Sequence, residues 1–242
     1  RSLMPPTAGA WILAIGITLR LHRCDARPPY QMMTAIYQSP PVLLHSTGNS
    51  MKPKQAEIIR HSMSLFNKEG YQSPSIDRIS ENAGISKMTF YRYYPDKEAL
   101  ILDILQQKEC DFMQALQDIT ADKPTGREKL FAVFEYYNNW FTCADFHGCM
   151  FTRALFEYGT SSPAIRTICS QFKSRLYQFF RDILIGLLKP EPAERVAMMM
   201  LMLIDGAIAA QQAESSECRE IPPGITAWSA AKALIYSEGG TL

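Results

Sequence analysis

The chain has 242 residues, of which 47% are hydrophobic and 20% charged, and its formal net charge is +1. This composition excludes a disordered chain and a polycation, and the length suffices for one large domain or two modest ones. The six cysteines have no disulfide-scaffold spacing, so we expect a reducing, cytoplasmic location. The net charge is slightly positive through residue 101 and negative beyond it, which weakly favours nucleic-acid contact near the front.

Residues 1–50 lack the periodicity of a folded domain. The apolar run at 8–19 is too short to span a bilayer comfortably, and no clear small-residue cleavage site follows it. Residues 23–50 are rich in Pro and Ser, which is typical of loop or disorder. We therefore expect residues 1–50 to be a disordered or non-native extension. A membrane anchor or export signal and a native N-terminal arm are the alternatives.

Apolar residues recur at helical spacing from residue 53 onward, and no stretch shows convincing strand alternation. Pro53 suits the first turn of a helix over about 53–69, and Gly70 suits its stop. Asp96 suits the N-cap of a longer helix that ends near residue 120. Further helices are predicted over 126–144, 149–158, 163–188, 192–213 and 224–237. The predicted fold class is all-α, with about nine helices in total.

Two short helices joined by Ala-Gly-Ile-Ser lie between residues 73 and 94, and this is the pattern of a helix-turn-helix. Ser73 or Ser75 can cap the first of them, and Ser86 can cap the second. Gly84 supplies the positive φ that the sharp turn needs. The small side chain of Ala83 lets the two helices approach each other.

The stretch SIDRISENAGISKMTFYRYYPDKEALI, residues 75–101, resembles the DNA-binding region of the TetR family of bacterial transcriptional regulators. The family pattern runs roughly T-[IV]-x-x-I-A-x-x-A-G-[VI]-S-x-G-T-[LF]-Y-x-[HY]-F-x-x-K-x-x-L. The positions that match it or substitute conservatively are Ser75, Ile76, Ile79, Ala83, Gly84, Ile85, Ser86, Thr89, Phe90, Tyr91, Tyr93, Lys97 and Leu100. Tyr94 replaces the family's Phe, Ser80 its Ala, and Met88 its common Gly. Because Met88 stands at the front of the second short helix, this departure concerns base preference rather than the fold.

The resemblance implies a helix-turn-helix DNA-binding domain of three helices over residues 51–98 and a helical ligand-binding and dimerisation domain over 99–242. It implies a homodimer, paired through the last two helices, that binds a palindromic double-stranded DNA operator. A small-molecule effector in the C-terminal domain would release that DNA. We expect no cofactor, no metal and no membrane association. The chain has no G-x-S-x-G, P-loop or H-E-x-x-H motif, so we expect no enzyme.

A second hypothesis keeps this fold and drops its DNA-binding role. The chain would then be a helical small-molecule-binding or interaction protein that has lost specific DNA binding. The basic and aromatic character of the second short helix favours the regulator.

Helical spacing divides the aromatic run at 90–94 into two faces. Phe90 and Tyr94 share the face that packs on the preceding helices. Hydroxyls and cations on the other positions suit contacts with phosphates and base edges. The candidate DNA-binding residues are Ser75, Ser86, Lys87, Met88, Thr89, Tyr91, Arg92, Tyr93 and Lys97. The alternatives are that Tyr91 and Tyr93 half-pack on the next helix, that Lys97 is solvated, and that Ser75 is only a cap.

An aromatic-rich set lies in the helices expected to enclose the C-terminal domain. The candidate pocket residues are Phe134, Tyr137, Trp140, Phe141, Phe151, Arg153, Phe156 and Phe172. Such a set can be core as well as cage. Arg153 either meets an anionic ligand or pairs with Glu157 one turn on. Asp205, a lone carboxylate in an apolar helix, either polarises the pocket or lies at the dimer seam.

The segment CADFHGC at 143–149 places Cys143, His147 and Cys149 close together. Cys and His bind zinc, but C-x3-H-x-C is not a common ligand spacing and no fourth ligand is evident. A redox role for Cys143 or Cys149 is a second alternative. We favour packing at a helix end for all three.

Overall fold

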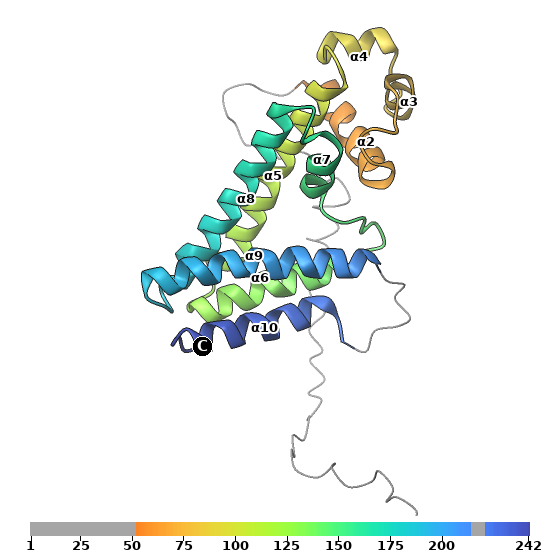
Figure 1. Cartoon of the computed structure of the whole chain (residues 1–242). Coiled ribbons are helices and arrows are strands. Elements are labelled where there is room, and N and C mark those ends of the chain that lie inside the picture. Colours follow the sequence, from red (N-terminus) through yellow and green to blue (C-terminus); the bar gives the residue numbers. More distant parts are fainter. Residues whose placement is uncertain (1–51, 214–220) are drawn as a thin grey trace, which may run out of the picture. The chain divides into compact units, whose positions relative to one another are not determined.

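The computed structural model describes residues 52–213 and 221–242 of the chain (Figure 1). Within these residues lie nine α-helices and no strand, which confirms the predicted all-α fold. The predicted extension at 1–50, with its apolar run, lies outside the described residues. Helix labels below are those of Figure 1.

Among the described residues, three helices precede the long helix α5, and each begins or ends at the residue that the sequence indicated. They are α2 (Pro53–Glu69), α3 (Ile76–Asn82) and α4 (Lys87–Tyr93), and α5 follows over Lys97–Ala121. The side-chain oxygens of Ser75, Ser86 and Asp96 cap α3, α4 and α5 by accepting a backbone N–H three residues on. Gly70 ends α2 with a φ of +84°, and Gly84 turns the chain between α3 and α4 with a φ of +62°.

Five further helices complete the described chain. They are α6 (Gly126–Phe141), α7 (Met150–Tyr158), α8 (Pro163–Leu184), α9 (Pro190–Ala213) and α10 (Pro223–Ser237). A capping box of Thr125 and Glu128 starts α6. Helices α6 and α8 end a few residues before the predicted limits, because apolar periodicity continues into the turns that follow them.

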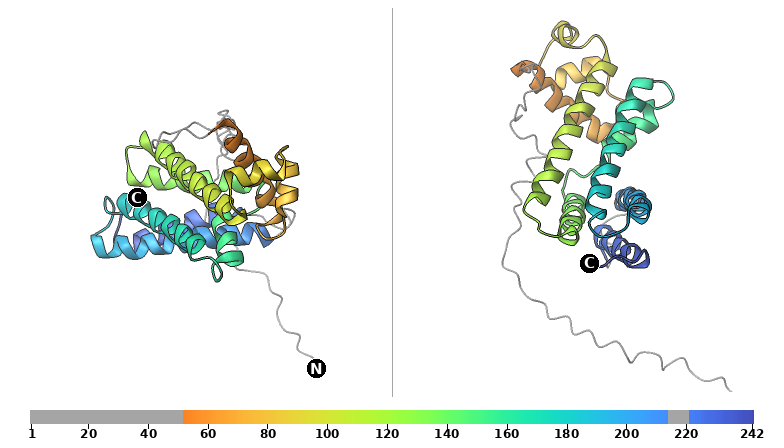
Figure 2. Two further views of the ribbon diagram at one scale, coloured as in Figure 1. Left: turned by 90° about the horizontal axis from the view of Figure 1, so that it is seen from above. Right: turned by 90° about the vertical axis from the view of Figure 1, so that its left-hand side faces the viewer.

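Helices α5 to α10 pack in two groups that share one hydrophobic core. Helices α5 and α8 lie along each other, and α7 packs on α8. Helices α6, α9 and α10 lie side by side, and in the right-hand view of Figure 2 α9 and α10 point nearly toward the viewer while α5 and α8 run lengthwise. Each large side chain buried in this core contributes roughly 1.5–3 kcal/mol of hydrophobic stabilisation.

Helix α9 is long and largely apolar. Among the described helices it alone is long and apolar enough to cross a membrane, judged by length and composition only. Its buried positions include Val196, Met200 and Ile204, and the helix packs against α8 and α10. An apolar core helix that packs between two others passes the same test.

Candidate functional site

The short helix α4 has one buried and one exposed face. Phe90 and Tyr94 are buried, with exposed fractions of 0% and 4%. Met88 and Tyr91 are exposed by 83% and 47%, and the flanking Lys87 and Arg92 are exposed as well. The division predicted from spacing is confirmed for Phe90 and Tyr94. Helix α4 therefore presents to solvent a surface made of two cations, a tyrosine and a methionine.

Buried contacts fix this helix on α5 and α2. The rings of Phe90 and Tyr94 lie 5.9 Å apart. The Tyr94 hydroxyl donates to Oδ2 of Asp103 on α5 at 2.6 Å, and Gln55 on α2 donates to the same oxygen at 3.1 Å. Burial, followed by the hydrogen bond to Asp103, raises the pKa of Tyr94 well above its ordinary value. One carboxylate thus links three helices beneath the exposed face.

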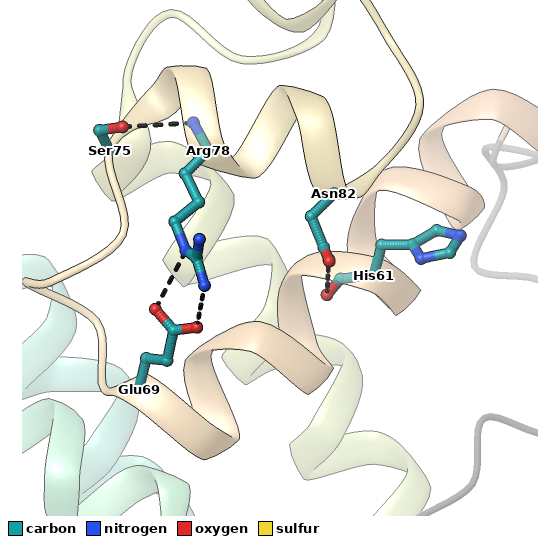
Figure 3. A network of polar contacts seen from close by, with 5 residues as sticks. All are labelled: His61, Glu69, Ser75, Arg78 and Asn82. Atoms are coloured by element: carbon teal, nitrogen blue, oxygen red, sulfur yellow. Dashed lines mark hydrogen bonds and ion pairs between the residues drawn. The ribbon is translucent and has the colours of Figure 1, made fainter.

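Polar contacts also hold α3 on α2 (Figure 3). The Arg78 guanidinium donates to both carboxylate oxygens of Glu69, at 3.1 and 2.5 Å. Asn82 donates to the backbone carbonyl of His61 at 3.0 Å. Bidentate pairing restricts the guanidinium in angle as well as distance, so α3 is fixed near both of its ends.

A small cavity lies among the helices beyond this three-helix unit. Its volume is about 30 Å³. Its walls come from α5, α6, α8, α9 and the start of α7. The lining residues are Lys108, Phe112, Tyr137, Trp140, Gly148, Cys149, Met150, Phe151, Phe172, Lys173, Leu176, Asp205 and Ile208. A volume of this size holds about one water molecule, whereas ligand pockets are about ten times larger.

Comparison with solved structures supports the fold. A TetR-family transcriptional regulator from Streptomyces coelicolor superposes with a TM-score of 0.69 at 22% identity, over 76% of this chain and 95% of that one. NemR of Escherichia coli in its reduced form superposes with a TM-score of 0.66 at 18% identity, over 75% and 96%. The family model for bacterial regulatory proteins of the tetR family matches residues 58–104. The chain belongs to the TetR family.

Sequence relatives of this TetR-family chain are transcriptional regulators. YjdC of Escherichia coli is 24% identical over 160 residues, which cover 64% of this chain and 82% of that protein. YuxN of Bacillus subtilis is 46% identical over 55 residues, which cover 23% of this chain and 19% of that protein. The fatty acid metabolism regulator protein of Bacillus subtilis is 27% identical over 79 residues, and this alignment spans 41% of its length. The chain is accordingly a TetR-family helix-turn-helix transcriptional regulator.

Several predicted DNA-binding residues of this regulator have local partners. Ser75 and Ser86 act as caps, and the Ser86 hydroxyl lies 2.9 Å from that of Thr89. Lys87 pairs with Asp77 of α3 at 2.8 Å, and both side chains are more than half exposed. An ion pair this exposed contributes little to stability, so Lys87 can exchange Asp77 for another anion at small cost.

Tyr93 and Lys97 are less accessible than the exposed face of α4. Tyr93 is half-buried against the core, and the guanidinium of Arg92 lies 5.7 Å from its ring centroid. The Lys97 ammonium donates to the carbonyls of Gln72 and Pro74, at 2.9 and 3.1 Å. Burial lowers the pKa of Lys97. Lys97 is therefore not the solvated lysine of the alternative reading, because it anchors the loop between α2 and α3.

The predicted pocket set divides in two. Tyr137, Trp140, Phe151 and Phe172 line the cavity, and the rings of Phe151 and Phe172 stack with centroids 3.8 Å apart. Phe134 and Phe141 are buried elsewhere in the core, Phe134 against Trp228. Phe156 was wrongly placed in the set. It is 84% exposed, because it lies on the outer face of α7.

Arg153 does not pair with Glu157, and it does not line the cavity. Its guanidinium donates to the carbonyls of Phe66 at 3.3 Å and Asn67 at 2.8 Å, where α2 ends. A third contact goes to the carbonyl of His147 at 3.4 Å. The last carbonyls of a helix lack intrahelical partners, so a cation from α7 satisfies the end of α2.

Three charged residues line the cavity. Asp205 was named from the sequence without its partner, and Lys108 and Lys173 were not named. Lys108 of α5 is 5% exposed. The Lys173 ammonium donates to both carboxylate oxygens of Asp205, at 2.5 and 2.7 Å. No partner for Asp205 was evident from the sequence, because Lys173 lies on another helix. A lysine on the apolar side of a helical repeat is the signal that would have pointed to Lys108.

The Cys-His segment between α6 and α7 forms no cluster of ligands. Within residues 52–213 and 221–242, no three His, Cys, Asp or Glu side chains converge as a metal site would require. Burial and the nearby Asp145 raise the pKa of Cys143, so its thiol is the dominant form at neutral pH. The carbonyl of His147 accepts from Arg153 and Gln212. These contacts fit packing at a helix end.

Proposed function

We propose that this regulator is a homodimeric repressor that binds a palindromic operator through α4 and leaves it when a small molecule enters the C-terminal cavity. The observation that carries the proposal is the exposed face of α4, with Lys87, Met88, Tyr91 and Arg92 held outward by two buried aromatics. Residues 51–98 act as the DNA-binding domain and residues 99–242 as the ligand-binding and dimerisation domain. Because the proposed partner is DNA, we infer that the protein acts in the cytoplasm.

Helix α4 enters the major groove, and each exposed side chain has a role there. Arg92 and Lys87 meet phosphates or guanine edges, and phosphate oxygen replaces Asp77 as the partner of Lys87. The Tyr91 hydroxyl bonds a phosphate or a base edge. The remaining candidates, Ser75, Ser86, Thr89, Tyr93 and Lys97, lie at helix starts or flanks and contact the phosphate backbone.

The dimer forms through α9 and α10, because both helices expose uncharged stripes. On α9 the exposed positions at helical spacing include Met198 and Met202, followed by Gly206 and Ala209. On α10 the exposed stripe consists of Ile225, Ser229, Ala233 and Tyr236. Small residues beside methionines let two helices approach closely and bury apolar area. A second copy of the chain would cover both stripes in a four-helix arrangement.

The effector enters the cavity lined by Tyr137, Trp140, Phe151 and Phe172. Because the cavity holds about 30 Å³, binding requires the surrounding helices to move apart. Helix α7 takes part in this movement, since Phe151 faces the cavity and Arg153 contacts the end of α2. Displacing α7 would then change the position of α2, and with it that of α4.

Binding to the DNA upstream of the protein's own gene tests the proposal. Affinity is measured by fluorescence anisotropy at several salt concentrations, with a scrambled duplex of equal length as the control. We expect tighter binding to the native duplex and a steep loss of affinity with salt, because phosphate contacts release counterions. Equal affinity for both duplexes would contradict specific operator binding at that DNA site. It would favour the second hypothesis, a small-molecule-binding or interaction protein of the same fold.

A further inference from the structure

The cavity carries an excess of positive charge within apolar walls. Among its lining residues, the charged ones are Lys108 from α5, Lys173 from α8 and Asp205 from α9. The rest of the wall is largely aromatic and aliphatic. A site of this composition suits a ligand with an apolar body and few charged atoms. These three charged residues determine whether the site favours an anionic or a cationic ligand.

Lys108 is the charge that lies deepest. It is 5% exposed, and burial lowers its pKa to about 8, with Asp111, Asp145 and Cys149 acting in the opposite sense. An ammonium this deeply buried has lost most of its hydration. A ligand anion beside this ammonium is attracted by its positive charge, whereas a ligand cation is repelled in a region of low dielectric.

Lys173 and Asp205 form the outer rim. Together with Cys149 they are the lining residues that are not fully buried. Their side chains are 31% and 44% exposed, so the ion pair is partly screened by water and costs little to separate. A ligand anion can therefore replace Asp205 as the partner of Lys173.

We propose that the effector is an organic anion with a carboxylate on a planar apolar body. Its carboxylate lies between Lys108 and Lys173, and its body lies against the aromatic wall formed by Phe112, Tyr137 and Trp140. The inference rests on the proposed function only in taking this cavity as the effector site. Aromatic rings with Asp205 also suit a quaternary ammonium, but the buried ammonium of Lys108 opposes such a ligand.

Lys108 also connects this cavity to the helix-turn-helix unit. It borders a second cavity of about 40 Å³ whose lining includes Met63, Ser64 and Asn67 of α2. An anion that draws the Lys108 ammonium toward the first cavity changes the contacts beneath α2. The charge of the ligand thereby affects the packing of α2, on which the position of α4 depends.

Three probes with the same naphthyl body and different charge test the proposal on the full chain without DNA. They are 2-naphthoate, 2-naphthamide and 2-naphthyl-trimethylammonium, and their binding is followed by calorimetry and thermal shift. We expect 2-naphthoate to bind most tightly. Lys108→Met should lower the affinity for 2-naphthoate by roughly tenfold or more, which is the usual effect of losing a charged hydrogen-bond partner.

Asp205→Asn is the matched variant with the opposite expected sign. It removes the anion that competes for Lys173, so 2-naphthoate should bind roughly two- to fivefold more tightly. Because Asp205 is partly exposed, this variant keeps the proposal testable even if Lys108→Met fails to fold. Preference for the ammonium probe would overturn the proposed anion in favour of a cation. Weaker 2-naphthoate binding by Asp205→Asn would overturn the placement of the carboxylate beside Lys173.

Two further outcomes overturn the proposal. One is that a folded Lys108→Met chain binds 2-naphthoate as tightly as the parent, which would place the probe elsewhere. The other is that none of the three probes binds. Neither result bears on the repressor itself, because operator binding is measured separately and without probe.

Discussion

The Glu157 carboxylate on α7 accepts the backbone N–H of Tyr71, just beyond α2, at 2.9 Å. The same oxygen accepts the N–H of Gln72 at 2.7 Å, and the Tyr71 hydroxyl donates to the carbonyl of Met150 at 3.2 Å. A Cβ on Gly70 would lie 2.8 Å from Glu157 Oε1. The α2–α3 loop is thus bound to a helix that follows it by more than eighty residues along the chain.

Replacing Glu157 tests this connection. Glu157→Ala leaves the Tyr71 amide without its acceptor, so we expect a loss of about 1–3 kcal/mol in the free energy of unfolding. Urea unfolding measures that loss, and hydrogen exchange should show faster exchange of the Tyr71 amide. Glu135→Ala, an exposed substitution on α6, is the control and should change stability by less than about 0.5 kcal/mol. Unchanged exchange at Tyr71 would show that the contact does not protect the loop.

Tyr94→Phe should destabilise the chain by about 1–2 kcal/mol, because Asp103 loses a buried hydroxyl donor and keeps only Gln55. Tyr91→Phe removes a hydroxyl from the exposed face of the same helix and should leave the free energy of unfolding within about 0.5 kcal/mol of the parent. Urea denaturation of the three proteins checks the difference. Equal stability of both variants would contradict the linking role of Asp103.

Arg92→Ala should lower operator affinity and reduce the slope of log affinity against log salt by about one, provided that Arg92 contacts a phosphate. Tyr91→Ala should lower affinity with little change in slope, because it carries no charge. Lys123→Ala, an exposed cation just after α5, is the control for loss of charge far from α4. Fluorescence anisotropy measures all three, and unchanged affinity in both α4 variants would refute the assignment of this face.

Met202→Glu should convert the proposed homodimer into a monomer of 27.4 kDa, because it places a charge in the middle of the exposed stripe on α9. Phe156→Glu makes the same change at an exposed apolar position on α7 and should leave the proposed homodimer intact. Light scattering after gel filtration gives both masses. A Met202→Glu chain that stays dimeric would exclude this stripe as the interface.

Lys108 gives the stability a pH dependence with a definite sign. Its folded pKa of about 8 lies below the ordinary value of 10.5, so the unfolded chain binds more protons between these values and stability rises with pH. Below pH 8 the penalty is fully present, at most about 3 kcal/mol. Lys108→Met should therefore be more stable than the parent at pH 6.5, with an advantage that shrinks toward pH 9.5. Urea unfolding of both proteins at both pH values measures this advantage. A stability difference that does not change with pH would contradict the lowered pKa of Lys108.

Local signals in the sequence were sufficient for the helix-turn-helix. Ser86 caps α4, Gly84 turns the chain with a positive φ, and Phe90 and Tyr94 lie on the buried face. Each of these outcomes depends on residues within four positions of one another. Backbone geometry and helical spacing act over that range, so the cap, the turn and the buried face can be predicted directly from the sequence.

The partners of charged side chains were not accessible in this way. Arg153 and Glu157 are spaced one turn apart, and the sequence suggested that they pair. In the structure both turn instead to the end of α2, where unpaired backbone groups offer better partners. The spacing rule failed because an exposed pair within one helix gains less than a contact that satisfies half-buried polar groups.

The sequence by itself determined the all-α architecture, the family and the face of α4 that points outward. Only the tertiary structure decided that Lys108 is buried, that Lys173 pairs with Asp205, and that Phe156 is exposed. Helical periodicity states which side of a helix is apolar, but not which neighbour covers that side. The covering helix comes from a distant part of the chain, and packing among all the helices selects it.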